Sequence, residues 1–173
     1  NCPVSKKITQ SIFNEPFRDD DHFCGGYREY WTGVGGCDGG TGPIEIHFID
    51  EVNPGYFWIF PVSENVVNVG VGMVISEQRK QKGMRSSLKK MQKWITSESP
   101  RFSHRFKNAQ MVEGTGKGWQ LPFGSPRMKP ASFQPRRGAM AGAMCVGDSA
   151  SLVDPFTGEG IGNALVSAKL TAK

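Results

Sequence analysis

Residues 147–165 read GDSASLVDPFTGEGIGNAL, and this stretch decides the predicted fold. The residues before it, Ala139 to Val146, are small and apolar, as in a buried strand that ends at Gly147 and Asp148. A loop follows, and the glycines at 158 and 160 then open a helix. Helical spacing places four of its apolar side chains on one face: Ile161, Ala164, Leu165 and Ala168.

This order of strand, acidic residue, glycine turn and helix is typical of a nucleotide-type cofactor site. An aspartate at the carboxyl end of a strand can accept hydrogen bonds from hydroxyl groups, as Asp148 would. Glycines at a helix start expose backbone N–H groups to negative charge. An ordinary crossover from a strand to a helix produces the same pattern without any ligand. The pattern alone leaves both interpretations open.

The middle of the chain predicts antiparallel β-structure. Its first apolar residues alternate with polar ones: Ile44, Ile46 and Phe48 with Glu45 and His47. That period predicts a strand whose apolar face is buried. The sequence Asn53-Pro54-Gly55 is a turn signal, and two further strands are expected over 56–62 and 66–75.

The short connection Ser63–Asn65 predicts a hairpin between these last two strands. If the strands pair symmetrically about the connection, Trp58 lies opposite Gly70 and Tyr56 opposite Gly72. Tyr56, Trp58 and Phe60 would then project from one face beside glycines, where there is room for a flat ligand. Aromatic side chains at a period of two are also typical of a core strand packed against a helix, and the pattern alone favours that interpretation.

The period changes after Ser86 and predicts helices. Leu88, Met91 and Ile95 recur at helical spacing with lysines between them, and Pro100 ends the stretch. A second short helix is expected to carry Phe102 and Phe106 on one face, and another strand is expected over 119–122. These elements define the fold class as α+β, with a mixed, mainly antiparallel sheet covered on one face by helices from 84 to 107.

Composition limits the classes of protein to which the chain can belong. Its 173 residues are the length of one ordinary domain, and no run of 18 apolar residues predicts a membrane-spanning helix. Residues 1–75 carry four basic and ten acidic side chains, whereas residues 76–173 carry 17 and six, and the net charge is +5. The basic excess, from Arg79 to Arg137, is either a solvated surface or a contact for an anionic group or membrane surface. It lacks the motifs of nucleic-acid-binding domains, so no nucleic-acid partner is expected.

Metal binding and disulfide bonds are not predicted. The four cysteines are scattered without a Cys-x-x-Cys pair, and the three histidines lie far apart, so no metal site is expected. Such cysteine usage favours a cytoplasmic location. The sequence begins at Asn1 and ends within a helical pattern, so we expect an interior piece of a longer protein.

Two stretches resemble a known family. Residues 147–165 closely resemble the second FAD-binding segment of flavoproteins with the p-hydroxybenzoate hydroxylase fold. PGYFWIFP at 54–61, followed by NVGVGM at 68–73, resembles the active-site strand pair of the geranylgeranyl reductase family within that group. The resemblance extends from about Tyr27 to Lys173 and is weakest in the basic helical stretch.

The resemblance implies FAD as the cofactor. Asp148 would accept a hydrogen bond from a ribityl hydroxyl group, with Gly147 allowing close approach. The helix that begins near Gly160 would direct its positive end toward the pyrimidine ring of the flavin. Backbone atoms of four residues would line the isoalloxazine ring: Pro155, Gly158, Gly160 and Ile161.

The resemblance also implies a substrate and a reaction. Tyr56, Trp58 and Phe60 would form the apolar wall of a cavity over the flavin. In the family, such a cavity holds a polyprenyl chain or similar lipid-like molecule, and hydride passes from reduced FAD to an isolated alkene while a proton reaches the other carbon. An unactivated alkene offers no hydrogen-bonding group, so the site must work by apolar shape and exclusion of water.

The sequence departs from the family at one important point. The family begins with a G-x-G-x-x-G turn that binds the FAD diphosphate, and this sequence has none. The resemblance then implies three segments: 1–25 connect from a missing FAD domain, 26–137 form the substrate domain, and 138–173 supply the last strand and helix of a Rossmann-like FAD domain. We expect these residues alone to hold FAD weakly and to be inactive.

Two alternative functions remain. The FAD segment is shared across the fold, so a related electron-transfer flavoprotein or hydroxylase is the nearest alternative. A non-catalytic basic domain that binds anionic surfaces is the alternative from another class. For the enzyme, the partners are a prenyl or lipid-like substrate, an unidentified electron donor and a membrane surface that a cytoplasmic protein could contact.

Overall fold

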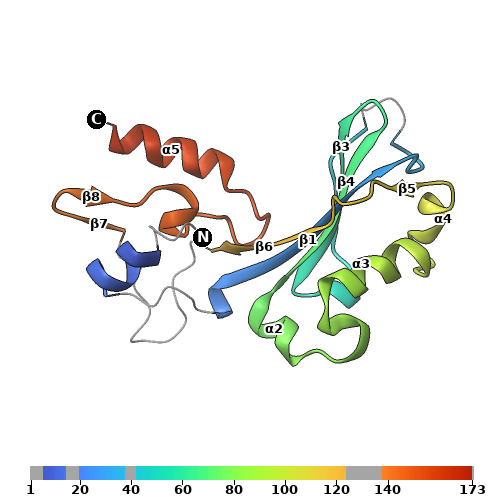
Figure 1. The fold of residues 1–173 in the computed structure, drawn as a ribbon, viewed down its shortest axis with the longest axis horizontal. Coiled ribbons are helices and arrows are strands. Elements are labelled where there is room, and N and C mark those ends of the chain that lie inside the picture. The colour runs from blue at the N-terminus through green and yellow to red at the C-terminus, as the bar shows by residue number, and fades with distance from the viewer. Residues whose placement is uncertain (1–5, 15–19, 38–41, 124–137, 173) are drawn as a thin grey trace. The chain divides into compact units, whose positions relative to one another are not determined.

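The computed structural model describes residues 6–14, 20–37, 42–123 and 138–172. The chain divides into two compact units, residues 25–119 and residues 1–24 with 120–173. Each unit is built from its own elements, and Figure 1 shows the ribbon of both. Arg136 and Arg137, at the end of the basic stretch, lie outside the described residues.

A six-stranded sheet organises the unit 25–119. The strand order is β2-β3-β4-β1-β5, and β6 also pairs with β1. The β2–β3, β3–β4 and β1–β5 pairs are antiparallel, which confirms the mixed, mainly antiparallel α+β class. The strands are β1 (Phe23–Thr32), β2 (Glu45–His47), β3 (Gly55–Ser63), β4 (Val66–Val74), β5 (Gln110–Met111) and β6 (Lys117–Pro122).

The register of the β3–β4 hairpin is the one that the short connection predicts. Tyr56 pairs with Gly72, Trp58 with Gly70, and Phe60 with Asn68. The register shifts between Pro61 and Ser63, next to the turn. The outward row of aromatic side chains therefore lies beside small residues of β4, as the sequence analysis expects.

Helices cover one face of this sheet (Figure 1). They are α2 (Ile75–Lys80), the 3₁₀ turn η5 (Gly83–Ser86), α3 (Leu88–Ser97) and α4 (Ser103–Phe106). Leu88, Met91 and Ile95 of α3 are buried, as their spacing predicts. Ser87 caps α3 by accepting a hydrogen bond from the Lys90 N–H. Phe102 and Phe106 are buried in the same core.

Strand β3 is apolar on both faces, and only one face belongs to the core. Phe57 and Ile59 are fully buried against the helices, whereas Tyr56, Trp58 and Phe60 point to the other side and stay partly exposed. Core packing of these three aromatics, which the pattern alone favoured, is therefore wrong. The helices occupy the face of Phe57, and among the described residues of this unit no helix covers the opposite row.

The expected orientation of β2 is also wrong. Ile44, Ile46 and Phe48 are exposed by 71%, 38% and 54%, so the apolar face of this strand is the open one. Glu45 and His47 face the core side, where the His47 ring packs against Phe102 at a centroid distance of 4.8 Å. Their polar groups pair with each other, and Glu45 also pairs with Arg105, 60 residues later in the chain.

An ion-pair network explains how a glutamate fits on that side of β2. Arg105 of α4 donates two hydrogen bonds to the Glu45 carboxylate at 2.6 and 2.8 Å, and its Nε donates to the Gly35 carbonyl at 2.7 Å. Glu45 also contacts His47 Nε2 at 2.9 Å. The hydrogen bonds from Arg105 hold the pKa of Glu45 below its ordinary value, against the effect of burial.

The second unit contains short elements and one longer helix. They are the π-helical turn η1 (Ile8–Ile12), the 3₁₀ turns η2 (Asp20–His22) and η7 (Gly147–Ala150), strands β7 (Ala139–Met140) and β8 (Ala143–Met144), and helix α5 (Ile161–Thr171). The expected single buried strand over 139–146 is wrong: β7 and β8 form an antiparallel hairpin. Gly142 lies between them at φ +83°, a conformation that lets the chain reverse. Most residues of this hairpin are exposed.

Helix α5 begins where the glycine pattern predicts, but its apolar face is open. Ile161 is 79% exposed and Leu165 is 68% exposed. A helix with such exposed aliphatic side chains presents a surface on which an apolar ligand or further protein can pack. Within the described residues, no helix is both long and apolar enough to cross a bilayer.

Candidate functional site

The open face of the sheet in the unit 25–119 carries a continuous row of aromatic rings. Phe48 meets Tyr56, Tyr56 meets Trp58, and Trp58 meets Phe60, at centroid distances of 5.9, 5.9 and 6.0 Å. The first two contacts are edge to face and the third is stacked, both favourable arrangements for aromatic pairs. The row offers a broad apolar surface to a ligand.

The sequence pattern predicts only part of this row. Tyr56, Trp58 and Phe60 are brought together as predicted, but Ile46 and Phe48 also belong to the same surface. Ile46 pairs with Trp58 across the β2–β3 ladder. The alternation of apolar residues in β2 is the sequence signal for Ile46 and Phe48, but its period alone predicts that this apolar face is buried.

The room expected beside the β4 glycines is filled by a side chain of the row itself. A Cβ atom at Gly70 would lie 2.8 Å from Trp58 Cη2 and nearer still to two other ring atoms. The indole therefore lies across β4 at Gly70. A flat ligand on this face would contact the Trp58 ring. Because Gly70 has no side chain, that ring can pack flat against β4.

In the other unit, a compact loop leads from η7 into α5. The Asp154 carboxylate accepts hydrogen bonds from Thr157 N at 2.7 Å, Thr157 Oγ1 at 2.8 Å and Phe156 N at 3.1 Å. These bonds, those from Thr157 first, hold the pKa of Asp154 below its ordinary value. Hydrogen bonds from Phe156 and Thr157 to the Asp154 carboxylate, which is ionised at neutral pH, thus hold the loop in its conformation.

Four of the six predicted cofactor residues line one pocket. It has a volume of about 340 Å³ and is bordered by Asp148, Gly158, Gly160 and Ile161, with Leu121, Val153, Ala164 and Leu165 completing the wall. Asp148 is exposed, and within the described part of the chain its carboxylate makes no hydrogen bond. A Cβ atom at Gly160 would lie 3.2 Å from Asp148 Oδ1, so glycine keeps the start of α5 clear of this carboxylate.

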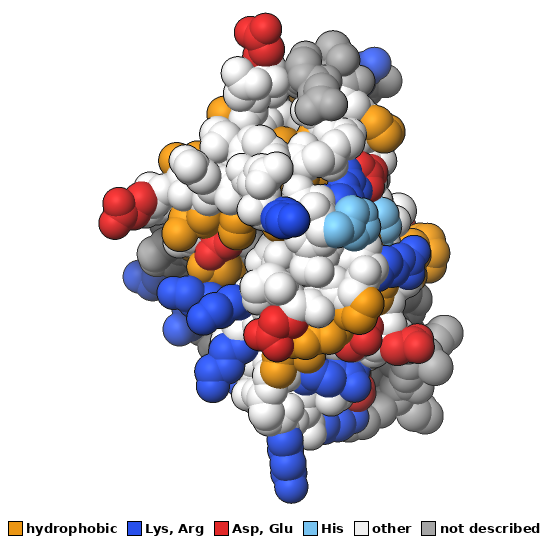
Figure 2. Space-filling model, turned by 90° about the vertical axis from the view of Figure 1, so that its right-hand side faces the viewer, with side chains coloured by type: hydrophobic (Ala, Val, Ile, Leu, Met, Phe, Trp, Pro, Cys, Tyr) orange, Lys and Arg blue, Asp and Glu red, His pale blue; other side chains and the backbone are white. Residues whose placement is uncertain are grey.

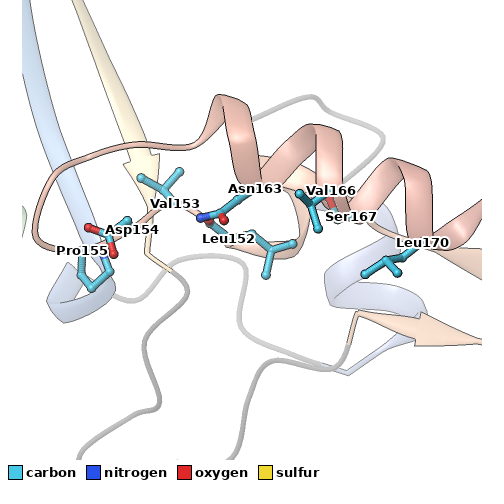
Figure 3. Close-up of a pocket in the computed structure, with 8 residues that line it drawn as sticks. All are labelled: Leu152, Val153, Asp154, Pro155, Asn163, Val166, Ser167 and Leu170. Carbon is cyan, nitrogen blue, oxygen red and sulfur yellow. The ribbon is translucent and has the colours of Figure 1, made fainter.

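The other two predicted residues lie elsewhere. Pro155 borders a neighbouring pocket of about 360 Å³, where it lies with Asp154 beside the α5 residues Asn163, Val166, Ser167 and Leu170 (Figure 3). Gly147 is buried against α5: a Cβ atom there would come 2.9 Å from the Ala164 Cβ atom. Its N–H donates to Ser167 Oγ at 3.1 Å. Gly147 therefore joins η7 to α5.

Replacing Gly147 by alanine should loosen this joint. The residue has φ +55°, which costs about 1 kcal/mol for a residue with a Cβ atom. The methyl group would also push Ala164 away, so we expect a total loss of about 2 kcal/mol. The measurement is chemical unfolding of the full-length protein.

Two variants separate the causes in that experiment. Gly142→Ala meets the same kind of backbone cost at φ +83° but has no atom within 4 Å of its new Cβ atom. Ala164→Gly removes the methyl group that the new Cβ atom would meet, so Gly147→Ala should cost about 1 kcal/mol less in that background than in the wild type. Equal losses for Gly142→Ala and Gly147→Ala would show that the contact with Ala164 has no energetic weight.

The start of α5 already carries a negative charge. Glu159 Oε1 accepts a hydrogen bond from the Gly162 N–H at 2.6 Å. A carboxylate in this position offsets part of the positive potential of the helix N-terminus. An approaching ligand would therefore meet Glu159 together with the helix dipole.

The first pocket fits part of a flavin. Its volume lies near the lower end of the range for ligand pockets, about 300–1,000 Å³. Aliphatic side chains supply an apolar surface for a flat ring, and the Asp148 carboxylate supplies an acceptor for a hydroxyl group. Among the described residues, no group of three or more His, Cys, Asp or Glu side chains could hold a metal ion.

Comparisons with known proteins find relatives of this chain. The chain is 29% identical over 134 residues to a digeranylgeranylglycerophospholipid reductase of Methanoculleus marisnigri, covering 77% of this chain and 29% of that protein. It is 32% identical over 129 residues to the protein of the same name from Thermoplasma acidophilum, covering 73% and 28%. The chain thus spans less than a third of the length of these relatives.

A solved structure shares the fold. The geranylgeranyl bacteriochlorophyll reductase-like protein of Thermoplasma acidophilum superposes with a TM-score of 0.68 at 25% identity, over 90% of this chain and 34% of that one. The family described as the geranylgeranyl reductase catalytic domain matches residues 26–116, more than half of the 173 residues. This chain belongs to the geranylgeranyl reductase family.

Proposed function

We propose that this chain is part of an FAD-dependent reductase that saturates alkenes of a polyprenyl or similar lipid-like substrate. FAD is the cofactor that membership of the family indicates. It would bind in the pocket of about 340 Å³ at the start of α5, which is lined by Asp148, Gly158, Gly160 and Ile161. When bound, the flavin supplies the hydride for the reduction.

One observation supports the flavin assignment above the others. The Asp148 carboxylate is exposed and borders an apolar pocket at the start of α5, with no hydrogen-bonding partner in the described part of the chain. An ordinary strand-to-helix crossover has no need of a free carboxylate there. A ligand that carries hydroxyl groups would donate hydrogen bonds to it in place of water.

The aromatic row is the proposed substrate site. Its side chains bind by apolar contact, which suits a hydrocarbon chain without hydrogen-bonding groups. Tyr56, Trp58 and Phe60 are proposed as the wall, and Ile46 and Phe48 extend it. Their proposed role is to orient the hydrocarbon chain of the substrate and to exclude water while hydride and a proton add to the two alkene carbons.

Replacing Asp148 by alanine in the full-length protein tests the cofactor site. The change removes a charged acceptor, and a hydrogen bond to a charged group contributes about 1.5–3 kcal/mol. We expect FAD affinity to fall by about tenfold to a hundredfold, measured by quenching of flavin fluorescence. Glu113→Ala removes an exposed carboxylate from the other unit and should leave the affinity unchanged.

The same preparation distinguishes the reaction classes. With reduced flavin and a prenyl diphosphate under anaerobic conditions, the product should gain two hydrogen atoms for each alkene reduced. A product that gains oxygen in air would replace the reductase by a hydroxylase. If Asp148→Ala binds FAD as tightly as the wild type, the pocket beside α5 is not the flavin site.

The remaining proposed partners are a membrane surface and an electron donor. The exposed lysines of α3, Lys89, Lys90 and Lys93, lie on the side of that helix turned away from the core. Figure 2 shows Lys and Arg side chains gathered at the lower left of the face in view. We propose that such a basic surface contacts anionic lipid headgroups while the substrate enters, because clustered cations favour a dense anionic surface. An electron donor that reduces the flavin is a further proposed partner.

The proposed domain boundaries are those that the resemblance implies. Residues 1–25 are assigned as a connection, 26–137 as the substrate domain and 138–173 as the second flavin segment, with Rossmann-like character. The match of the catalytic-domain family to residues 26–116 supports the middle assignment.

A further inference from the structure

The Trp58 indole is held in one orientation by two residues of the neighbouring strand. Its Nε1 donates a hydrogen bond to Asn68 Oδ1 at 3.0 Å. A Cβ atom at Gly70 would overlap the six-membered part of the ring. The ring tip extends further, since a Cβ atom at Gly26 of β1 would lie 3.9 Å from Trp58 Cη2. The indole thus crosses β4 and reaches β1.

The hydrogen bond matters because of the surface on which it lies. An indole carries one N–H donor and no acceptor. A hydrocarbon chain cannot accept a hydrogen bond, so an N–H left facing such a chain would lose its partner water without replacement. Asn68 accepts the bond from within the sheet. The surface that the ring offers is then apolar throughout.

The orientation of the ring also fixes the shape of the wall. Trp58 lies between Tyr56 and Phe60 in the row, with ring contacts to both. Rotation of the indole away from β4 would break these contacts and raise a large side chain above the sheet. A substrate without polar groups has only such contours to set its position along the wall. Small displacements of a reacting carbon can cost a hundredfold in rate.

We propose that Asn68 is a positioning residue that holds the Trp58 indole flat and so determines which alkene of the chain is placed for reduction. This inference rests on the proposed function, since it assigns a role at the same substrate site. Asn68 acts through Trp58 and need not touch the substrate. Gly70 provides the space, and Asn68 provides the restraint.

The test uses the full-length protein with FAD bound and geranylgeranyl diphosphate as the substrate. Asn68→Leu keeps the size of the side chain and removes the acceptor. We expect kcat to fall about tenfold with a smaller change in KM, and the partly reduced products to change in the position of the remaining double bonds. Asn68→Asp keeps an acceptor and should recover most of the rate and the original product pattern.

A spectroscopic reading separates positioning from loss of structure. With ¹⁵N-labelled tryptophan, the Trp58 indole N–H signal, assigned by its absence in Trp58→Phe, should move upfield in Asn68→Leu and return in Asn68→Asp. Flavin content should stay equal in all variants. Asn65→Leu introduces the same substitution in the exposed hairpin turn and should change neither reading.

The outcomes distinguish this inference from the proposed function. If the wild-type protein binds no FAD or reduces no prenyl substrate, the proposed function fails. If the wild type is active and Asn68→Leu shows an unchanged indole signal, or a moved signal with unchanged rate and products, the positioning role of Asn68 is wrong.

Discussion

Gly70→Ala is expected to destabilise the protein by about 3 kcal/mol, at the upper end of the usual cost of overpacking. Gly70 is buried in β4, which is paired on both sides, so the backbone cannot retreat. The new methyl group would displace the Trp58 indole, which also loses its hydrogen bond to Asn68. Chemical unfolding of the full-length protein measures the loss.

A double variant identifies the indole as the cause. Trp58→Leu removes the ring that the methyl group would meet, so Gly70→Ala should cost about 2 kcal/mol less in that background. Gly118→Ala is the matched control, because a Cβ atom there has only ordinary contacts, the nearest at 3.6 Å. Additive losses in the double variant would mean that Gly70 is needed for another reason.

Arg105→Met is the second substitution with a large expected effect. It leaves the Glu45 carboxylate without its two strongest hydrogen bonds and the Gly35 carbonyl without its Nε donor. Breaking a fully buried pair costs about 3–5 kcal/mol. Because the two side chains are 16% and 17% exposed, we expect a smaller loss of about 2–3 kcal/mol. Lys107→Met removes an exposed cation two residues along the chain and should change stability by less than about 0.5 kcal/mol.

The pH dependence of stability gives an independent reading of the same pair. Arg105 lowers the pKa of Glu45, so the unfolded chain binds a proton at this site more readily than the folded chain. The stabilisation is therefore complete above the unfolded pKa, about 4.3, and is lost as the pH falls through the folded pKa. In Arg105→Met, the free energy of unfolding should therefore fall less steeply as the pH is lowered below about 4.3. The same pH dependence in wild type and variant would show that Arg105 does not stabilise the ionised form of Glu45.

The sequence predicts local geometry in this protein better than it predicts which faces are buried. The β3–β4 register follows from a short connection, and α3 follows from the spacing of Leu88, Met91 and Ile95, because both signals lie within a few residues. Strand β3 has no such signal for its buried face. Its residues are apolar on both sides, so only the position of the helices decides that Phe57, and not Trp58, enters the core.

Contacts between distant residues account for the remaining errors. Glu45 is stabilised on the core side by Arg105, which lies 60 residues later in the chain. No local sequence pattern predicts such a pair. The segment 139–146 is apolar enough for a buried strand, but Gly142 turns it into a hairpin. At the proposed flavin pocket, the sequence pattern predicts Asp148 and Gly160 as lining residues. The position of Gly147 against α5 depends instead on packing with Ala164.

The two-sided character of β3 has a consequence for engineering. Odd-numbered positions such as Phe57 and Ile59 pack into the core, while even-numbered positions such as Tyr56 and Phe60 line the open surface. A mutant library restricted to these even positions would vary the proposed substrate wall and keep the melting temperature, whereas the same diversity at the odd positions would mainly yield aggregated protein. Selection could therefore reshape that proposed wall along one strand while the scaffold stays constant.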